Sequence, residues 1–128
     1  MKLVPQRVGG DCGVAALATL LEQSYEDVYI AAAKVDQKTR GRNGIQLGAL
    51  KAIGKKLGVS FLLKRTYEDD DEGVLVVNWV KPHAHPFDGH LVAVSYGVIA
   101  DPADGVILPV DDYLARYKAT AGSCLELR

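Results

Sequence analysis

The sequence has little of what marks several protein classes. Its 128 residues include two cysteines, which can form one disulfide at most, so a disulfide-rich secreted scaffold is excluded. Its apolar runs are far shorter than the ~20 residues needed to cross a bilayer. Because 15 basic residues stand against 16 acidic ones, the net charge is −1, and no overall positive field favours nucleic acid or an anionic membrane.

The opening residues, MKLVPQRVGGDCG, also lack the apolar core of a secretory signal. We therefore expect a cytoplasmic protein without a membrane span, whose thiols stay reduced. With 48% hydrophobic and 24% charged residues, the chain can bury a core of ordinary composition. Its length fits a single domain over residues 1–128.

Helical patterns dominate the first half of the chain. An Ala- and Leu-rich stretch predicts a helix from about 12 to 22. Ser24 is placed to cap a second, amphipathic helix, with Asp27 three residues later in the manner of a capping box. Leucine and isoleucine at three- and four-residue steps predict a third helix from about 46 to 57, which ends at Gly58.

Strand patterns follow the third helix. Apolar segments predict strands at 59–63, 74–80, 91–96, 98–100, 106–110 and 123–127. The acidic run 68–72 is expected to form a solvated turn, and Gly97 a tight hairpin or bulge. Asp111 and Asp112 are expected to cap a brief helix through Tyr117. Helices first and an antiparallel sheet second predict an α+β fold of two packed layers.

Cys12 stands at the predicted start of the first helix, between Asp11 and Gly13. A thiol in the first helical turn lies beside unpaired backbone N–H groups and the positive end of the helix dipole. Both favour the thiolate, which is the nucleophilic form. Gly9 and Gly10 allow a bent approach to the helix. An isolated cysteine is nevertheless more often a buried, inert side chain, so Cys12 needs partners to be a nucleophile.

Two residues later in the chain could be those partners. His90 opens an apolar strand, and Asp101 ends the next strand before a proline. If a hairpin at Gly97 pairs these strands, His90 and Asp101 come near the same edge, although their unequal distances from Gly97 require a bulge or a frayed end. Taken singly, His90 would be a surface or hydrogen-bonded histidine and Asp101 a common turn residue.

The string QRVGGDCGVAAL, from Gln6 to Leu17, resembles the opening motif of the C39 peptidases, which process bacteriocin leader peptides. The similarity continues through 44–50, through His90-Leu91-Val92-Ala93-Val94, and through the Asp-Pro-x-x-Gly segment at 101–105. These segments occur in the family's order over nearly the whole chain. The resemblance implies a papain-like cysteine peptidase fold, with N-terminal helices packed on a C-terminal antiparallel sheet.

The resemblance also implies a role for each site residue. Cys12 would be the nucleophile, His90 the base and Asp101 the residue that orients the imidazole. The Gln6 side-chain amide and the Cys12 backbone N–H would hold the oxyanion. The implied reaction is hydrolysis of a peptide or protein substrate through a thioester acyl-enzyme, without a cofactor or a metal.

Other functions fit parts of the same pattern. His83, His85, His90 and Cys12 could bind zinc, but they lack a second ligand pair at a defined spacing. The fold could also be a non-catalytic peptide-binding module, although binding alone would not need Cys, His and Asp together. Finally, the triad could perform deamidation, deconjugation or acyl transfer, because these reactions share the acyl-enzyme step.

Three further features are expected to be structural. Trp79 is predicted to lie in the core, and Cys124, in an apolar strand, to be a buried thiol. The polar and basic residues of 37–43 are predicted to form a solvated loop. None of them is assigned to the site.

Overall fold

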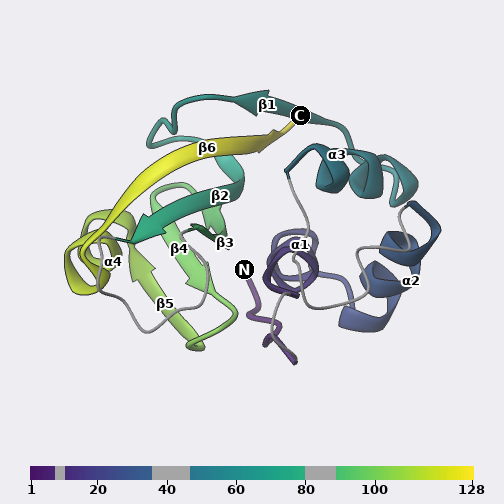
Figure 1. Cartoon of the computed structure of the whole chain (residues 1–128), viewed down its shortest axis with the longest axis horizontal. Helices are drawn as coiled ribbons and strands as arrows, with labels where there is room; N and C mark the ends of the chain where they lie inside the picture. Colours follow the sequence, from purple (N-terminus) through teal and green to yellow (C-terminus); the bar gives the residue numbers. More distant parts are fainter. Residues whose placement is uncertain (8–10, 36–46, 80–88) are drawn as a thin grey trace.

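The computed structural model describes residues 1–7, 11–35, 47–79 and 89–128. These residues form the α+β arrangement that the sequence predicts (Figure 1). The described part contains four helices, α1 (Cys12–Leu21), α2 (Tyr25–Val35), α3 (Leu47–Lys56) and α4 (Val110–Tyr117). It contains six strands, β1 (Phe61–Lys64), β2 (Glu72–Trp79), β3 (Gly89–Ser95), β4 (Val98–Asp101), β5 (Val106–Pro109) and β6 (Ala119–Leu127). Within these ranges, no helix has the length and apolar character of a membrane span.

The six strands form one antiparallel sheet in the order β1-β6-β2-β3-β4-β5. The last strand of the chain therefore lies between the first two, as the curved yellow ribbon in Figure 1 shows. β6 begins at Ala119, four residues before the predicted start at Ser123, because this early part pairs with the end of β2.

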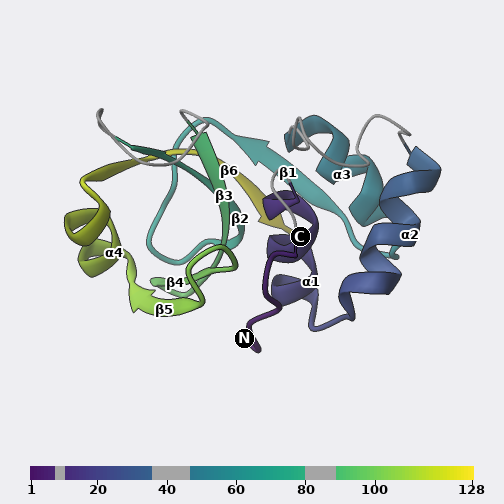
Figure 2. The ribbon, with the colours of Figure 1, turned by 60° about the horizontal axis from the view of Figure 1, so that its bottom comes forward.

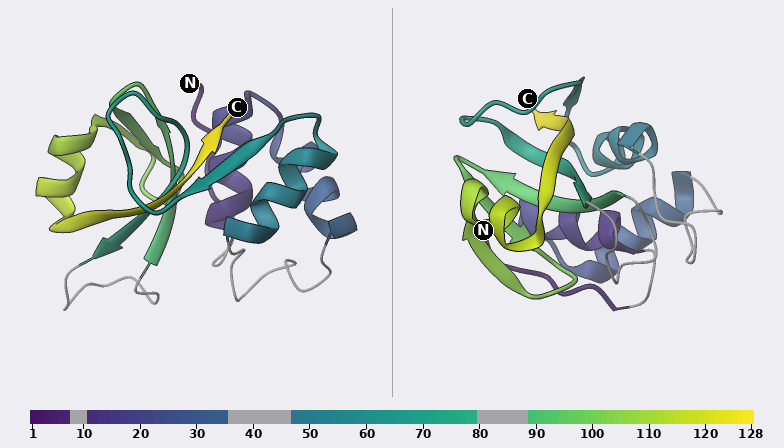
Figure 3. Two further views of the ribbon diagram at one scale, coloured as in Figure 1. Left: turned by 90° about the horizontal axis from the view of Figure 1, so that it is seen from above. Right: turned by 60° about the vertical axis from the view of Figure 1, so that its left-hand side comes forward.

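Helices cover the two sides of the sheet unequally. α1, α2 and α3 gather on one side, and α4 lies on the other (Figures 1 and 2; also Figure 3, left). Each side has its own core, so the prediction of two packed layers is wrong: the sheet lies between two layers of helices. Leu17 of α1, Val28 of α2 and Leu50 of α3 pack with Val74, whereas Leu75 belongs to the core on the other side. Because successive side chains of a strand alternate between faces, β2 and β3 are buried on both sides.

The predicted helix ends are confirmed. α1 ends at Leu21, and Glu22 after it adopts the left-handed conformation with φ of 55°. Ser24 caps α2, since its Oγ accepts a hydrogen bond of 3.1 Å from the Asp27 N–H. Gly58, with φ of 86°, follows α3.

The connection between β3 and β4 is the tight hairpin that the sequence predicts, but its turn is one residue longer than Gly97 alone. Two residues join the strands, because Tyr96 and Gly97 both have positive φ, 48° and 82°. Positive φ at both central residues is typical of a type I′ hairpin. Tyr96 was predicted to end the strand, but it belongs to the turn, which is why the expectation of Gly97 alone was wrong.

α4 also begins differently from the prediction. The helix starts at Val110, with Pro109 at the N-cap position and no side-chain hydrogen bond there. Asp111 and Asp112 therefore do not cap the helix but lie in its first turn. Their carboxylates remain favourable there, because the N-terminal end of a helix carries partial positive charge.

The acidic run before β2 is predicted to form a solvated turn, and this prediction is wrong for Asp71. Asp71 is buried, and its carboxylate accepts hydrogen bonds of 2.9 and 3.0 Å from Lys64 Nζ. Asp71 Oδ2 also accepts from the Glu68 N–H at 2.9 Å. Because Lys64 reaches Glu126 at 3.3 Å as well, the turn is attached to both β1 and β6.

Several predictions concern residues outside the described ranges. They are the bent approach at Gly9 and Gly10, the basic loop 37–43, the motif residues 44–46, and the histidines at 83 and 85.

Candidate active site

Cys12 is the first residue of α1 and is half-buried. The helix starts here because the Asp11 carbonyl accepts a 3.0 Å hydrogen bond from the Ala15 N–H. The Cys12 N–H belongs to the first turn, where backbone N–H groups have no partner within the helix. The predicted position of the thiol at a helix N-terminus is therefore present in the fold.

Asp11 fixes the segment that leads into Cys12. Its Oδ2 accepts hydrogen bonds from the Arg7 N–H at 2.9 Å and from the Tyr25 hydroxyl at 2.7 Å. The Arg7 guanidinium lies 4.2 Å from the centre of the Tyr25 ring and forms an ion pair with Glu26 of α2. These contacts attach the N-terminal segment to the beginning of α1.

Gln6 lies in this N-terminal segment and is half-buried. Its backbone N–H donates a 2.9 Å hydrogen bond to the carbonyl of Pro102. Since Arg7 is held by Asp11, the segment runs between the start of α1 and the turn after Asp101. The Gln6 backbone thus lies beside the turn that follows Asp101.

His90 and Asp101 form a fully buried hydrogen-bonded pair. His90 Nε2 lies 2.7 Å from Asp101 Oδ1, and the side chains are 0% and 1% exposed. The β3–β4 ladder is regular from Ser95–Val98 to Ala93–Ala100. One further step of this register would put Asp101 opposite Val92, two residues after His90. The side chains of His90 and Asp101 are therefore diagonal neighbours on one face of the sheet. Of the two predicted alternatives, a bulge or a frayed end, the bulge is therefore unnecessary, and the paired residues of the ladder end at Ala93–Ala100.

Asp101 accepts hydrogen bonds at both carboxylate oxygens. Oδ1 accepts from the Ala103 N–H at 2.9 Å in addition to the His90 ring, and Oδ2 accepts from the Tyr113 hydroxyl at 2.6 Å. Burial would raise the pKa of Asp101, but the hydrogen bond and charge of His90, with the donors Tyr113 and Ala103, hold it below its usual range. Asp101 is an anion with a fixed orientation.

Cys12 interacts with the other side of the His90 ring. Because Nε2 is bonded to Asp101, Nδ1 is the nitrogen that remains for the sulfur. Burial would lower the pKa of His90, but the hydrogen bonds and charges of Asp101 and Cys12 raise it to about 9. The imidazole is therefore a cation at neutral pH, and a neighbouring cation favours a thiolate.

Trp79 covers the imidazole. It is the last residue of β2, and its ring stacks on His90 with centroids 5.0 Å apart and planes inclined by 25°. The sequence predicted Trp79 as a core residue, and it is indeed 9% exposed. Its contact with His90 was missed, because neither the motif nor the spacing links a strand end to a histidine 11 residues later.

No protein-family model matches the sequence, and no curated protein matches it significantly. The chemistry of the site is therefore the basis for any functional assignment.

Cys124 provides a contrast to Cys12. It is fully buried in β6, as predicted, and burial, with a contribution from Asp71, raises its pKa to about 12. A thiol with so little thiolate at neutral pH is chemically inert. The two cysteines therefore differ sharply in their surroundings.

The zinc alternative involves His83 and His85, which lie outside the described residues. Among the residues that the structure does describe, no three His, Cys, Asp or Glu side chains gather as metal ligands. The hydrogen bond of His90 to Asp101 and the effect of Cys12 on the pKa of His90 are those of a thiol–imidazole site.

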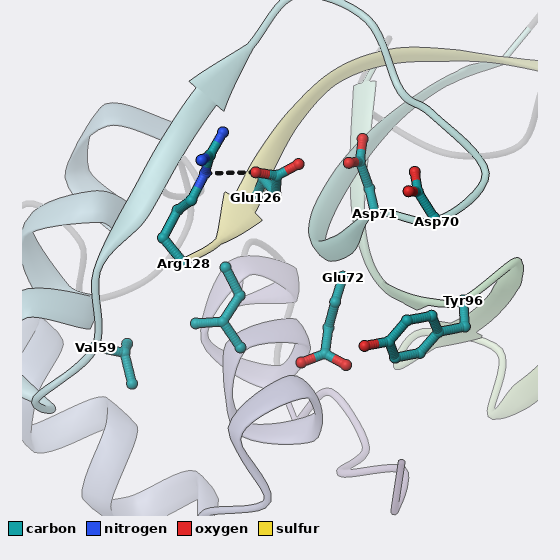
Figure 4. A pocket seen from close by; sticks show the side chains of 8 residues that line it. Val59, Asp70, Asp71, Glu72, Tyr96, Glu126 and Arg128 are labelled. Carbon is teal, nitrogen blue, oxygen red and sulfur yellow. Dashed lines mark ion pairs between the residues drawn. The ribbon is translucent and has the colours of Figure 1, made fainter.

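A hollow of about 460 Å³, drawn in Figure 4, is lined by none of the predicted site residues Cys12, His90 and Asp101. It is lined by Val59, Asp70, Asp71, Glu72, Tyr96, Glu126, Leu127 and Arg128. Tyr96 follows the end of β3, whereas His90 stands near the start, so the hollow and the pair are at opposite ends of this strand. Three of its four carboxylates have partners in the fold, since Glu126 pairs with Arg128 at 2.6 Å, Glu72 accepts from Ser95 Oγ at 3.0 Å and Asp71 accepts from Lys64 Nζ. We assign it no ligand.

Proposed function

We propose that this chain is a papain-like cysteine peptidase with Cys12 as its nucleophile. The observation that carries the proposal is the buried 2.7 Å hydrogen bond between His90 and Asp101. The imidazole of this pair also interacts with Cys12, which lies at a helix N-terminus. A nucleophile, a base beside it and a third group that orients the base are the three parts of an activated-nucleophile site.

In the first half of the reaction, the Cys12 thiolate attacks the carbonyl carbon of a peptide bond and forms an S–C bond. The carbonyl electron pair moves to oxygen, where the Cys12 backbone N–H and the Gln6 side-chain amide stabilise the charge. When the pair returns, the C–N bond breaks, and the leaving amine takes a proton from the His90 imidazolium. The product that stays on the enzyme is a thioester.

In the second half, neutral His90 removes a proton from water, and the resulting hydroxide attacks the thioester carbonyl. The C–S bond breaks and Cys12 leaves as thiolate beside the protonated imidazole, which restores the starting state. Asp101 stays ionised throughout and holds the ring so that Nδ1 faces the sulfur.

The burial of this pair favours catalysis over simple peptide binding. Removing a carboxylate and an imidazolium from water costs several kcal/mol per ion before their attraction offsets it. A peptide-binding module would gain nothing from a buried His–Asp pair beside a cysteine at a helix N-terminus, whereas a thiol enzyme requires one. Deamidation, deconjugation and acyl transfer use the same residues and differ in the group that leaves or attacks.

The decisive experiment is selective labelling. The protein is treated at pH 7 with an epoxide probe of the E-64 type, digested, and mapped by mass spectrometry. We expect label on Cys12 and none on Cys124, whose raised pKa of about 12 makes it an internal control. Cys12 reacting no faster than a free thiol such as N-acetylcysteine would overturn the proposal.

A second assay identifies the reaction. A mixture of unstructured peptides is incubated with the wild type and with Cys12→Ala, and the products are compared by mass spectrometry. Peptide cleavage that depends on Cys12 supports a peptidase. Ammonia release with a mass change of one dalton, without cleavage, would replace the peptidase by an amidohydrolase that uses the same triad.

A further inference from the structure

Tyr113 contacts the proposed triad on the face of the sheet that α4 covers, opposite the face that α1, α2 and α3 cover. It lies on α4, its side chain is 0% exposed, and its hydroxyl donates a 2.6 Å hydrogen bond to Asp101 Oδ2. Asp101 Oδ1 is already used by His90 and the Ala103 N–H. The carboxylate is thus held at three points by groups from β3, from the turn after β4 and from α4.

The hydroxyl of Tyr113 has a definite chemical role in this contact. Burial, together with the charge of Asp101, raises the pKa of Tyr113 far above its ordinary value, so the phenol remains a neutral donor. A buried phenol costs free energy unless its O–H finds an acceptor. Here the acceptor is the oxygen of Asp101 that His90 does not use.

We propose that Tyr113 is a positioning residue of the site, which fixes the carboxylate plane of Asp101 and, through it, the orientation of the His90 ring. The proposal rests on the cysteine peptidase function argued above. Without the Tyr113 hydroxyl, the buried Asp101 Oδ2 loses the donor that it has among the described residues, and the carboxylate can turn about its Cβ–Cγ bond. The imidazole would then spend less time with Nδ1 towards the Cys12 sulfur.

The chain contains a matched control one turn further along α4. The Tyr117 hydroxyl also donates a 2.6 Å hydrogen bond to a carboxylate, Oδ2 of Asp104, but this contact is exposed. The rings of Tyr113 and Tyr117 lie 4.5 Å apart, so both phenols share the same helix and the same neighbourhood. Tyr113 donates to Asp101, which belongs to the proposed triad, whereas Tyr117 donates to Asp104, which does not.

The test compares Tyr113→Phe with Tyr117→Phe, both of which keep the ring and remove the hydroxyl. Steady-state kinetics are measured at 10 °C on a peptide that the wild type cleaves, beside a melting curve for each variant. We expect Tyr113→Phe to lower kcat roughly 10- to 100-fold, below the ~10²–10⁴-fold of a positioned acid–base group itself. KM should change little, because the Tyr113 side chain is fully buried and is not at the surface where a substrate would bind. Tyr117→Phe should match the wild type in both.

A double-mutant cycle separates positioning from a general structural role. In an Asp101→Ala background, adding Tyr113→Phe should leave kcat unchanged, because the group through which Tyr113 acts is gone. The comparison of Asp101→Ala with the double variant can also be made if Tyr113→Phe alone does not fold. Removing both partners of a buried hydrogen bond destabilises the fold less than removing one partner. A further loss of fivefold or more in the double variant would show that Tyr113 acts by another route.

The two proposals fail in different ways. If the wild type neither cleaves peptides nor reacts selectively at Cys12, the peptidase function is wrong and the role of Tyr113 falls with it. If the wild type is active and Tyr113→Phe has the wild-type kcat, the positioning role alone is wrong.

Discussion

The indole of Trp79 lies almost parallel to the imidazole of His90, with ring centroids 5.0 Å apart and planes 25° apart. Trp79 ends β2, and the neighbouring β3 carries His90 opposite Val77. The stacked ring shields the imidazole from solvent on one face. It thereby protects the hydrogen bond to Asp101 from competition with water.

The first prediction concerns this shield. Trp79→Ala should reduce kcat/KM, because water then reaches the His90–Asp101 bond, and it should also cost ~3–5 kcal/mol of stability by opening the core. Trp79→Phe keeps an aromatic face and should retain most activity. The measurement is kcat/KM at a temperature where urea unfolding shows both variants folded. Equal activity in folded Trp79→Ala and wild type would make Trp79 a core residue without a role in the site.

The second prediction separates the oxyanion donor from the base. Gln6→Ala should lower kcat by ~10²–10³, because it removes a donor aimed at the developing oxyanion. It should leave the rate of Cys12 alkylation by iodoacetamide unchanged, since alkylation forms no oxyanion. His90→Ala should slow alkylation at neutral pH as well, because the sulfur loses its cationic neighbour. Equal alkylation rates in His90→Ala and wild type would show that the two side chains do not act as a pair.

The third prediction concerns the charge of Asp101. Asp101→Asn can still accept from His90 through its carbonyl oxygen, while its amide group meets the Tyr113 hydroxyl, which can accept in turn. We expect a loss of roughly tenfold in kcat/KM. Asp101→Ala frees the imidazole and should approach the ~10²–10⁴-fold loss of positioned acid–base catalysis. Melting curves serve as the control, and unchanged kcat in Asp101→Ala would leave a Cys12–His90 dyad.

The fourth prediction is a pH dependence of stability. The pKa of His90 is raised from 6.5 to about 9 in the folded protein, so protonation of His90 stabilises the fold. This stabilisation is complete below about pH 6.5 and is lost as the pH rises through about 9. Its full size is on the order of 3 kcal/mol. Urea unfolding at pH 6 and pH 9.5 should show the loss in the wild type.

The control for this prediction is Asp101→Asn. Because the hydrogen bond of Asp101 is the largest of the causes that raise the pKa of His90, and the charge of Asp101 adds to it, the variant should show a smaller difference between the two pH values. If the wild type and Asp101→Asn lost the same stability between pH 6 and pH 9.5, groups other than the His90–Asp101 pair would cause the loss.

Local patterns were sufficient for most of the secondary structure. Ser24 and Gly58 bound their helices as predicted, because capping depends on hydrogen bonds and φ angles within a few residues. The errors occurred where a partner distant in sequence decides the outcome. Asp71 lies in an acidic run that is typical of a solvated turn, yet Lys64 on a neighbouring strand buries it. The early part of β6 forms a strand because β2 pairs with it.

The same division holds for the site. The sequence alone determined that Cys12 begins a helix and that His90 and Asp101 lie on adjacent strands of a hairpin, since helix starts and hairpins are local features. The tertiary structure decided that Trp79 stacks on the imidazole and that Tyr113 donates to the carboxylate. These contacts come from β2 and α4, and their geometry depends on sheet order and packing, which hydrophobic periodicity does not encode.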